Sequence, residues 1–256
     1  MSSIDLNADM GESFGPWQKG ADARLLEVVT SANIACGFHA GDPLVMARTV
    51  RAAHARGVNI GAHPGFPDLR GFGRRRPAIL DPDELGADIL YQIGALAAIA
   101  RAEGASLAHV KLHGALSNIA SEDRAVADTA MEAIARGAPG LAVVALAGTA
   151  LEAAARAAGL PVVAELFADR GYRPDGTLVP RGEPGAMIDD PKAAAERVLR
   201  MVEDRAITAV DGSRLPVEPD TICVHGDGPT AIAIAEAVRA RLEGAGIRVA
   251  PFRTRN

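Results

Sequence analysis

The sequence is poor in cysteine and in aromatic residues. Its two cysteines, Cys36 and Cys223, show no metal-binding spacing. We therefore expect both to be small buried hydrophobes in a protein of a reducing compartment, the cytoplasm. Aromatic residues make up 4% of the chain, whereas alanine and glycine are abundant. The predicted core is therefore aliphatic, with many close contacts between helices and sheet.

The chain also lacks long apolar runs and an excess of basic charge. No apolar run reaches the ~20 residues that span a bilayer, and the first residues have neither the basic nor the apolar segment of a signal peptide. The net charge of −5 argues against nucleic-acid binding, and the single basic cluster, residues 74–76, is too short to change this. We expect a cytoplasmic protein that binds neither membranes nor nucleic acid.

Strand-like and helix-like segments alternate along the whole chain, which indicates right-handed crossovers and a parallel sheet. A GxGxxG motif after the first strand is absent, which lowers the case for a dinucleotide-binding fold. Seven or eight strand–helix units in 256 residues fit a (β/α) barrel, and no linker divides the chain, so we expect one domain over residues 1–256. The expected strands are Ile4–Asn7, Ala32–Cys36, Val58–Ala62, Leu107–Lys111, Leu141–Leu146, Val162–Leu166, Thr221–Val224 and Arg248–Ala250.

Helix starts are marked by an acid followed by proline at residues 42–43, 81–82 and 190–191. Two connections, Pro64–Leu80 and Phe167–Asp189, are too long to be simple turns, and loops of this length are usually functional. The expected helices lie near Ala21–Thr30, Asp42–Arg56, Asp81–Glu103, Ser121–Arg136, Thr149–Ala158, Pro191–Glu203 and Pro229–Glu243.

Side chains suited to chemistry follow the predicted strands. Four of the six histidines, His39, His63, His113 and His225, lie just past a strand and close to a glycine. In a parallel barrel the carboxyl ends of the strands meet on one face, where such enzymes have their active sites. His54 and His109 are expected to be structural. The other candidate site residues are Asn7, Asp9, Glu12, Lys111, Glu165, Arg170, Arg181 and Asp227.

Lys111 is one of only three lysines among 27 basic residues. A lysine at a strand end in an arginine-rich chain suggests a need for a compact charge or a tunable amine. Lys111 or Asn7 could stabilise an oxyanion, a carboxylate or histidine could act as general base, and a second histidine could protonate a leaving nitrogen. Asp9, His63 and His113 could instead hold a divalent metal.

Seven motifs carry a resemblance to a known family. In order along the chain they are DLNADMGE, SANIACGFHAGDP, GAHPGFPD with GFGRR, HVKLHGALSN, ELFADRGY, GTLVPRGEPGA and ICVHGDGP. From about Ile4 to about Ile247 the sequence resembles the LamB/YcsF family. It departs from the family pattern at Leu112, where proline is typical, and at Ser117, where tyrosine is typical; these departures bear on substrate preference.

The resemblance implies an irregular (β/α) barrel of the glycoside hydrolase/deacetylase type. It also implies the A subunit of a bacterial ATP-dependent 5-oxoprolinase, which opens the 5-oxoproline lactam to L-glutamate together with B and C subunits. The nucleotide would be a magnesium complex of ATP, and copies of the chain could also associate with one another. No GxxxxGK[ST] motif is present, so ATP would be handled wholly or partly with the partners.

The resemblance also suggests roles for the candidate residues. Asp9 or His113 would be acid or base, with His63 beside them, and Lys111 would contact an oxyanion or phosphate together with Asn7. Arg170 or Arg181 would bind the substrate carboxylate. Two alternatives stay open: a metal-dependent deacetylase or amidohydrolase that acts alone, and a lactam-binding subunit without catalysis.

Overall fold

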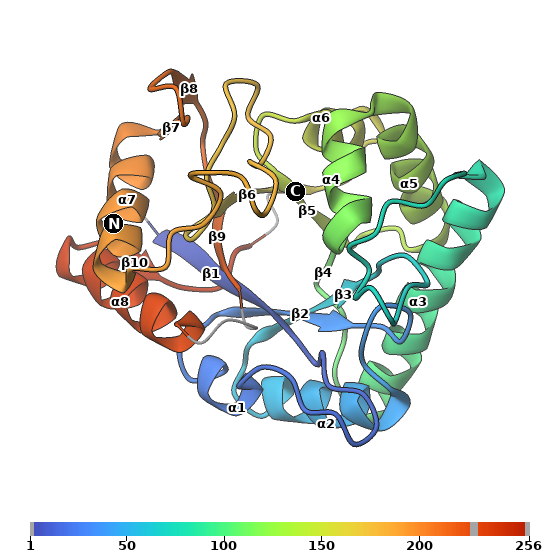
Figure 1. Ribbon diagram of the computed structural model, residues 1–256. Helices are drawn as coiled ribbons and strands as arrows, with labels where there is room; N and C mark the ends of the chain where they lie inside the picture. Colours follow the sequence, from blue (N-terminus) through green and yellow to red (C-terminus); the bar gives the residue numbers. More distant parts are fainter. Residues whose placement is uncertain (1–2, 226–229, 254–256) are drawn as a thin grey trace.

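A computed structural model describes residues 3–225 and 230–253 (Figure 1). Seven parallel strands close into a barrel in the order β1-β2-β3-β4-β5-β6-β9, and β9 pairs back with β1. This confirms the predicted (β/α) barrel. The barrel strands are β1 (Ser3–Met10), β2 (Ser31–Ala35), β3 (Asn59–His63), β4 (His109–Lys111), β5 (Ala142–Leu146), β6 (Val162–Phe167) and β9 (Thr221–Val224).

Helices surround the barrel, and the predicted capping acids begin three of them (Figure 1). Asp42, Asp81 and Asp190 each accept backbone N–H bonds in the first turn, with proline at the first helical position. The helices are α1 (Asp22–Leu25), α2 (Pro43–His54), α3 (Pro82–Ala102), α4 (Gly114–Glu122), α5 (Arg124–Gly137), α6 (Ala150–Ala157), α7 (Pro191–Asp204) and α8 (Ala231–Gly244).

Within the described residues, α3 is the one helix whose length and composition would allow it to cross a membrane. It contacts α2, α5 and β3, and it buries Leu85, Ile89, Ile93 and Leu96. These contacts place α3 in the helical layer of the barrel.

Four features of the fold differ from the sequence-based expectation. The helix expected over Ala21–Thr30 is only the single turn α1, and most of α4 was not expected, since the sequence predicted a helix there only from Ser121. A short antiparallel hairpin, β7 (Ala206–Thr208) and β8 (Arg214–Pro216), follows α7. The last expected strand exists as β10 (Arg248–Val249), but it pairs with the first residues of β1 outside the ring of seven.

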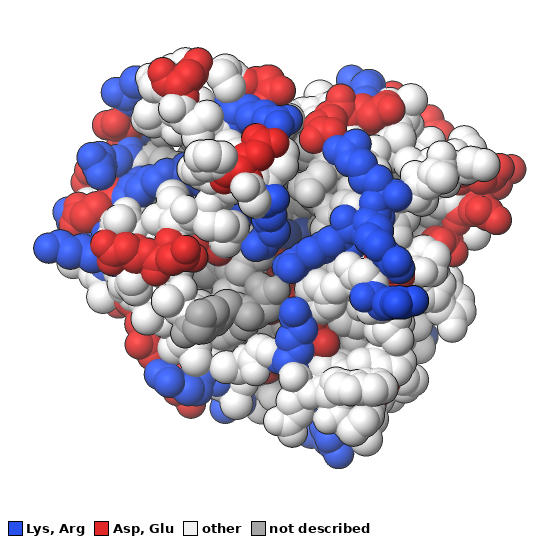
Figure 2. Space-filling view, viewed as in Figure 1, with Lys and Arg blue, Asp and Glu red and all other residues white. Residues whose placement is uncertain are grey.

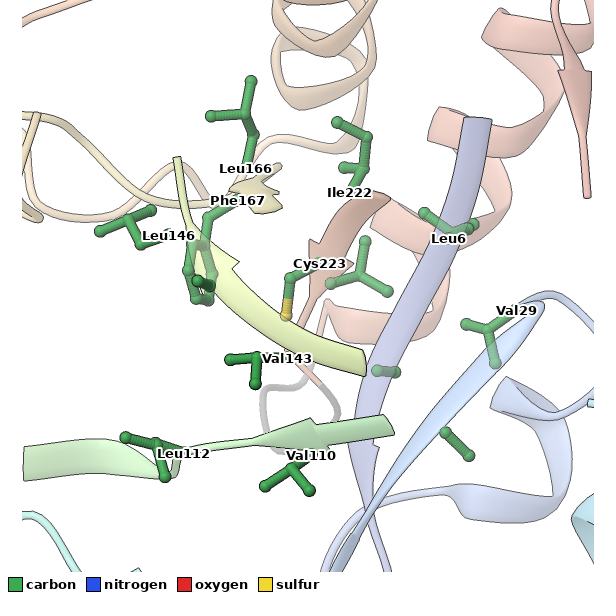
Figure 3. Packing of buried hydrophobic residues seen from close by; sticks show 14 of the residues in the cluster. Leu6, Val29, Val110, Leu112, Val143, Leu146, Leu166, Phe167, Ile222 and Cys223 are labelled. Atoms are coloured by element: carbon green, nitrogen blue, oxygen red, sulfur yellow. The ribbon is translucent and has the colours of Figure 1, made fainter. Parts of the chain in front are cut away.

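The aliphatic core lies between the barrel and its helices, as the composition predicted. Because successive strand residues point to opposite faces, Leu6, Val110 and Ile222 point outward into this layer, and each is fully buried (Figure 3). The strands are therefore buried on both faces, as is usual for parallel sheets.

The barrel interior also holds polar side chains, among them those of β1. Asp5, Asn7 and Asp9 alternate along β1 and so share its inner face. Asp5 accepts hydrogen bonds from Thr30, Ser31 and Thr221 near the amino-terminal end, where burial raises the pKa of its carboxyl. A line of polar side chains thus runs up the barrel axis toward the carboxyl ends of the strands.

His109 lies in the middle of this line. Its Nε2 donates to Asn33 Oδ1 at 2.7 Å, and its ring packs against Phe252. Gly61 is its register neighbour on β3, and a Cβ at Gly61 would lie 2.0 Å from the ring. Only glycine leaves room for this side chain. Burial lowers the pKa of His109 to about 3.

This low pKa predicts that the protein loses stability in mild acid. A histidine in the unfolded chain titrates near 6.5. The contribution of neutral His109 to the free energy of unfolding is therefore complete above that pH. As the pH falls toward 3 this contribution is lost, by up to ~1.4 kcal/mol per pH unit. We expect the loss of unfolding free energy between about pH 7.5 and about pH 5 to be ~2 kcal/mol smaller in His109→Asn than in the parent. Urea unfolding at both pH values measures this, and equal losses would contradict it.

Candidate active site

A cavity of about 390 Å³ opens at the carboxyl ends of the barrel strands. Its lining contains seven of the predicted site residues: Asp9, His63, Lys111, His113, Arg170, Arg181 and His225. Four others, Asn7, Glu12, His39 and Glu165, are buried and do not belong to the lining. The remaining candidate, Asp227, lies outside the described residues.

Lys111 is the central cation of the site. It is the last residue of β4, and its buried Nζ lies 2.7 Å from Glu165 Oε1, 3.1 Å from Asp9 Oδ1 and 3.0 Å from Cys223 Sγ. Burial alone would lower the pKa of Lys111, but the attraction of Asp9 and the other acidic groups raises it well above its ordinary value. Lys111 is therefore a permanent ammonium ion at the floor of the cavity.

Cys223 differs from its predicted role as a simple buried hydrophobe. Its sulfur accepts a hydrogen bond from Lys111. Burial raises the pKa of the thiol well above its ordinary value, so Cys223 is neutral. It is a polarizable neighbour of the ammonium ion and not a nucleophile. Cys36 is buried, as predicted.

Asp9 connects Lys111 to the histidines. Its Oδ1 accepts from Lys111 and, at 2.9 Å, from Asn33 Nδ2, whereas its Oδ2 lies 3.3 Å from His63 Nε2. Burial would raise the pKa of Asp9, but His63 and Lys111 outweigh this and hold it well below its ordinary value. Asp9 is therefore an ionised carboxylate with one oxygen fixed and the other directed toward His63.

Asn7 has no side-chain hydrogen left for a substrate. Its Nδ2 donates to Glu165 Oε1 at 3.1 Å and to Thr221 Oγ1 at 2.8 Å. Its Oδ1 accepts from Asn33 Nδ2 at 2.7 Å and from Lys111 at 3.3 Å. This geometry gives Asn7 a positioning role beneath Lys111, where the sequence had suggested contact with the substrate.

Three histidine rings pack together into a wall beside the cavity, and two of them, His63 and His113, line it. His63 Nδ1 bonds the backbone oxygen of Lys111 at 2.8 Å, and His113 Nε2 bonds that of Phe72 at 2.9 Å. The other nitrogens, His63 Nε2 and His113 Nδ1, lie 3.0 Å apart. His39 stacks on His113 with ring centroids 3.7 Å apart. Ligand atoms of Glu12, His39, His63 and His113 lie within 4.8 Å of one another, so this group could hold a metal.

Glycines allow backbone to pack directly against these rings. A Cβ at Gly65 would lie 2.7 Å from His39 Nδ1, and one at Gly73 would lie 2.8 Å from His113 Cδ2. Both glycines belong to the long connection between β3 and α3. That connection therefore shapes the histidine wall.

Four arginines, Arg74, Arg76, Arg170 and Arg181, line the cavity, and basic side chains gather around the centre of this face (Figure 2). Arg170 is buried and donates to the backbone oxygens of Val179 at 2.6 Å and Ala186 at 3.2 Å, and burial lowers its pKa to about 10. It therefore holds its own loop together. Arg74 and Arg76 were not predicted, although the GFGRR motif contains Arg74.

His225, which directly follows β9, lines the same cavity, and Asp169 contacts it from the loop after β6. Asp169 Oδ2 lies 2.7 Å from His225 Nδ1. Burial would raise the pKa of Asp169, but the attraction of His225 lowers it. The carboxylate thus fixes the orientation of the imidazole ring.

Known proteins resemble this chain along nearly its whole length. A sequence profile of the LamB/YcsF family matches residues 4–256. The chain is 56% identical over 248 residues to the 5-oxoprolinase A subunit of Methylococcus capsulatus, covering 97% of this chain and 95% of that protein. It is 54% identical over 252 residues to the 5-oxoprolinase A subunit of Rhodopseudomonas palustris, covering 98% and 99%.

Solved structures confirm the fold. The lactam utilization protein from Thermus thermophilus is 51% identical and superposes with a TM-score of 0.91 over 98% of this chain and 100% of that one. The Bc1960 peptidoglycan N-acetylglucosamine deacetylase, 11% identical, has a TM-score of 0.52 over 97% and 85%. The second likeness concerns the fold alone and fits the expected barrel type.

Proposed function

Because the chain belongs to the LamB/YcsF family, we propose that it is the A subunit of a 5-oxoprolinase, which opens the 5-oxoproline lactam to L-glutamate. Relatives that bear that name match this chain over nearly their full length. One observation of the site carries the chemical part of the proposal. A buried ammonium ion, Lys111, lies between two carboxylates at the floor of a small cavity lined by arginines.

The substrate fits this arrangement of charges. 5-Oxoproline has a carboxylate on one side of its ring and an amide carbonyl on the other. Arg74 and Arg181 on the cavity wall would bind the carboxylate, because guanidinium groups match its geometry. Lys111 would then polarise the carbonyl oxygen and stabilise the negative charge that develops on it. Arg170 supports the loop from which Arg181 comes.

Two groups are placed to move protons. The Oδ2 oxygen of Asp9 is the one not bonded to Lys111, so it would accept a proton from the attacking nucleophile. His225, held by Asp169, would protonate the leaving ring nitrogen. This assignment changes the sequence-based one, which gave the acid or base role to Asp9 or His113.

Coupling to ATP would overcome the stability of the ring amide. Transfer of the γ-phosphoryl group from ATP to the amide oxygen would release ADP and make the ring carbon a better electrophile. Water would add to that carbon and the C–N bond would break, and a second water would hydrolyse the resulting acyl phosphate to glutamate and inorganic phosphate. No P-loop motif occurs in the sequence, so we propose that ATP and its magnesium ion are bound wholly or partly by the B and C subunits. A reaction that consumes ATP also fits the predicted cytoplasmic location.

The test is glutamate release from 5-oxoproline by the purified chain with its B and C subunits. We expect release only when all three proteins and ATP are present, with glutamate and ADP formed together. Omission of this chain should reduce the rate to background. Glutamate release at the full rate by the B and C subunits alone would contradict the proposal.

The histidine group supports one alternative function, that of a metal-dependent amidohydrolase that acts alone. That enzyme would hydrolyse a small amide without ATP and without partners, and it would stop on chelation. The same assay without ATP and partners distinguishes the two functions.

A further inference from the structure

The donors and acceptors of His63 and His113 do not balance in the described structure. A backbone oxygen can only accept, so His63 Nδ1, 2.8 Å from the oxygen of Lys111, must carry a hydrogen. The same reasoning puts a hydrogen on His113 Nε2, 2.9 Å from the oxygen of Phe72. In neutral rings the remaining nitrogens, His63 Nε2 and His113 Nδ1, are then both acceptors.

These two acceptors face each other at 3.0 Å. Two lone pairs at this distance repel unless a positive species lies between or beside them, either a proton or a metal ion. A metal ion accounts for more of the neighbouring side chains than a proton does. Two nitrogens on a tetrahedral ion with metal–nitrogen bonds of about 2.0–2.1 Å lie roughly 3.3 Å apart, so only a small opening of the observed gap is needed.

The oxygen donors are also present. The Glu12 carboxylate, which follows β1, belongs to the group of ligand atoms within 4.8 Å of one another, and Asp9 Oδ2 lies 3.3 Å from His63 Nε2. The far nitrogens of both histidines are bonded to backbone carbonyls, the arrangement that orients metal-binding histidines. Asp9 shares its other oxygen with Lys111, which favours Glu12 as the direct ligand.

His39 has a different role from His63 and His113. It is fully buried, and neither ring nitrogen has a hydrogen-bond partner among the described residues. Its ring lies 3° from parallel to that of His113. Two stacked rings cannot both direct an in-plane lone pair at one ion, so His39 holds His113 in position in the observed arrangement. It would bind the ion itself only after its ring turned.

We propose that His63 Nε2, His113 Nδ1 and the Glu12 carboxylate form a binding site for a divalent first-row transition-metal ion such as Zn²⁺. Two imidazoles and one carboxylate suit zinc or iron(II) and do not suit calcium or magnesium, which prefer oxygen ligands. The ion would lie beside Asp9 and next to the cavity, because His63 and His113 both line it. The sequence had suggested Asp9 as the carboxylate ligand; the geometry adds Glu12.

The test measures zinc binding by the isolated chain, without substrate, ATP or partners, so it can fail or succeed independently of the proposed function. Protein freed of metal with a chelator and of any affinity tag is titrated with ZnCl₂ by calorimetry, and bound zinc is counted after dialysis. We expect about one equivalent. Co²⁺ in place of Zn²⁺ should give the visible spectrum of a low-symmetry nitrogen–oxygen site.

Variants locate the ion. His63→Gln, His113→Gln and Glu12→Gln should each weaken zinc binding by more than the roughly 10–100-fold caused by loss of an outer partner. His39→Gln should weaken it less. His225→Gln is the matched control, because it lines the same cavity but bonds Asp169.

Circular dichroism and thermal unfolding of the metal-free variants show whether each is folded. Since Glu12, His63 and His113 lie at the ends of different strands, at least one informative variant is expected to fold. The proposal is overturned if the parent binds no zinc, which would leave a shared proton between the rings. It is equally overturned if zinc binding is unchanged in the folded variants of the proposed ligands.

Discussion

Replacing Lys111 with methionine is expected to abolish most of the activity and to destabilise the fold at the same time. The change removes the ammonium ion and leaves Asp9 and Glu165 as buried carboxylates without their common partner. Removing one partner of a buried ion pair typically costs about 3–5 kcal/mol. Losing the group that stabilises a developing oxyanion typically lowers kcat by about 10²–10³.

The two effects are measured separately. Urea unfolding gives the loss of stability, and glutamate release with the B and C subunits, at a temperature where the variant is folded, gives the loss of rate. Lys192→Met is the control, because Lys192 is exposed on α7 and its replacement should change stability by less than about 0.5 kcal/mol. A folded Lys111→Met variant with the parent rate would show that Lys111 serves the fold alone.

Gly41→Ala is expected to destabilise the protein by about 2–5 kcal/mol. Gly41 has a φ of +78°, which costs other residues about 1–2 kcal/mol. A Cβ there would also lie 2.8 Å from two backbone oxygens, those of Ala35 at the end of β2 and Gly11 just after β1. Overpacking of this kind usually costs about 1–3 kcal/mol, and backbone at strand ends cannot move away easily.

Gly57 provides the matched control for this clash. It also has a positive φ, +66°, but nothing lies within 4 Å of its Cβ position. Gly57→Ala should therefore lower the free energy of unfolding only by the cost of the positive φ, about 1–2 kcal/mol. The difference in unfolding free energy between the two variants measures the clash at Gly41. Equal losses would mean that the ends of β1 and β2 can separate without cost.

Much of the fold was readable from the sequence because local signals agreed with one another. Acid–proline pairs marked three helix starts, and all three caps formed. The hairpin β7–β8 was missed although the Asp211-Gly212 pair is a turn signal, since three-residue strands give almost no periodicity. Helix α4 was missed because it begins directly after the site residue His113, and no helix was predicted before Ser121.

The site residues at the strand ends were predictable from the sequence. The contacts that depend on the register between strands were not. The histidines and Lys111 converge because parallel strands end on one face. In contrast, the bonds of Asn33 and Asn7 come from side chains on the inner face of different strands. The pairing of His109 with Gly61 joins positions far apart in the chain, and no local pattern specifies which residues share a level of the barrel.

The place of β1 in the barrel has a consequence for synthesis on the ribosome. This first strand lies between β2 and β9, and its earliest residues also pair with β10. At translation rates of about 5–20 residues per second, β9 is synthesised roughly 10–40 s after β2. During that time the inner face of β1, with Asp5, Asn7 and Asp9, lacks part of its hydrogen-bond partners. The growing chain therefore presents an open sheet edge to the cell until the last barrel strand arrives, and its charged inner face would oppose pairing with other chains.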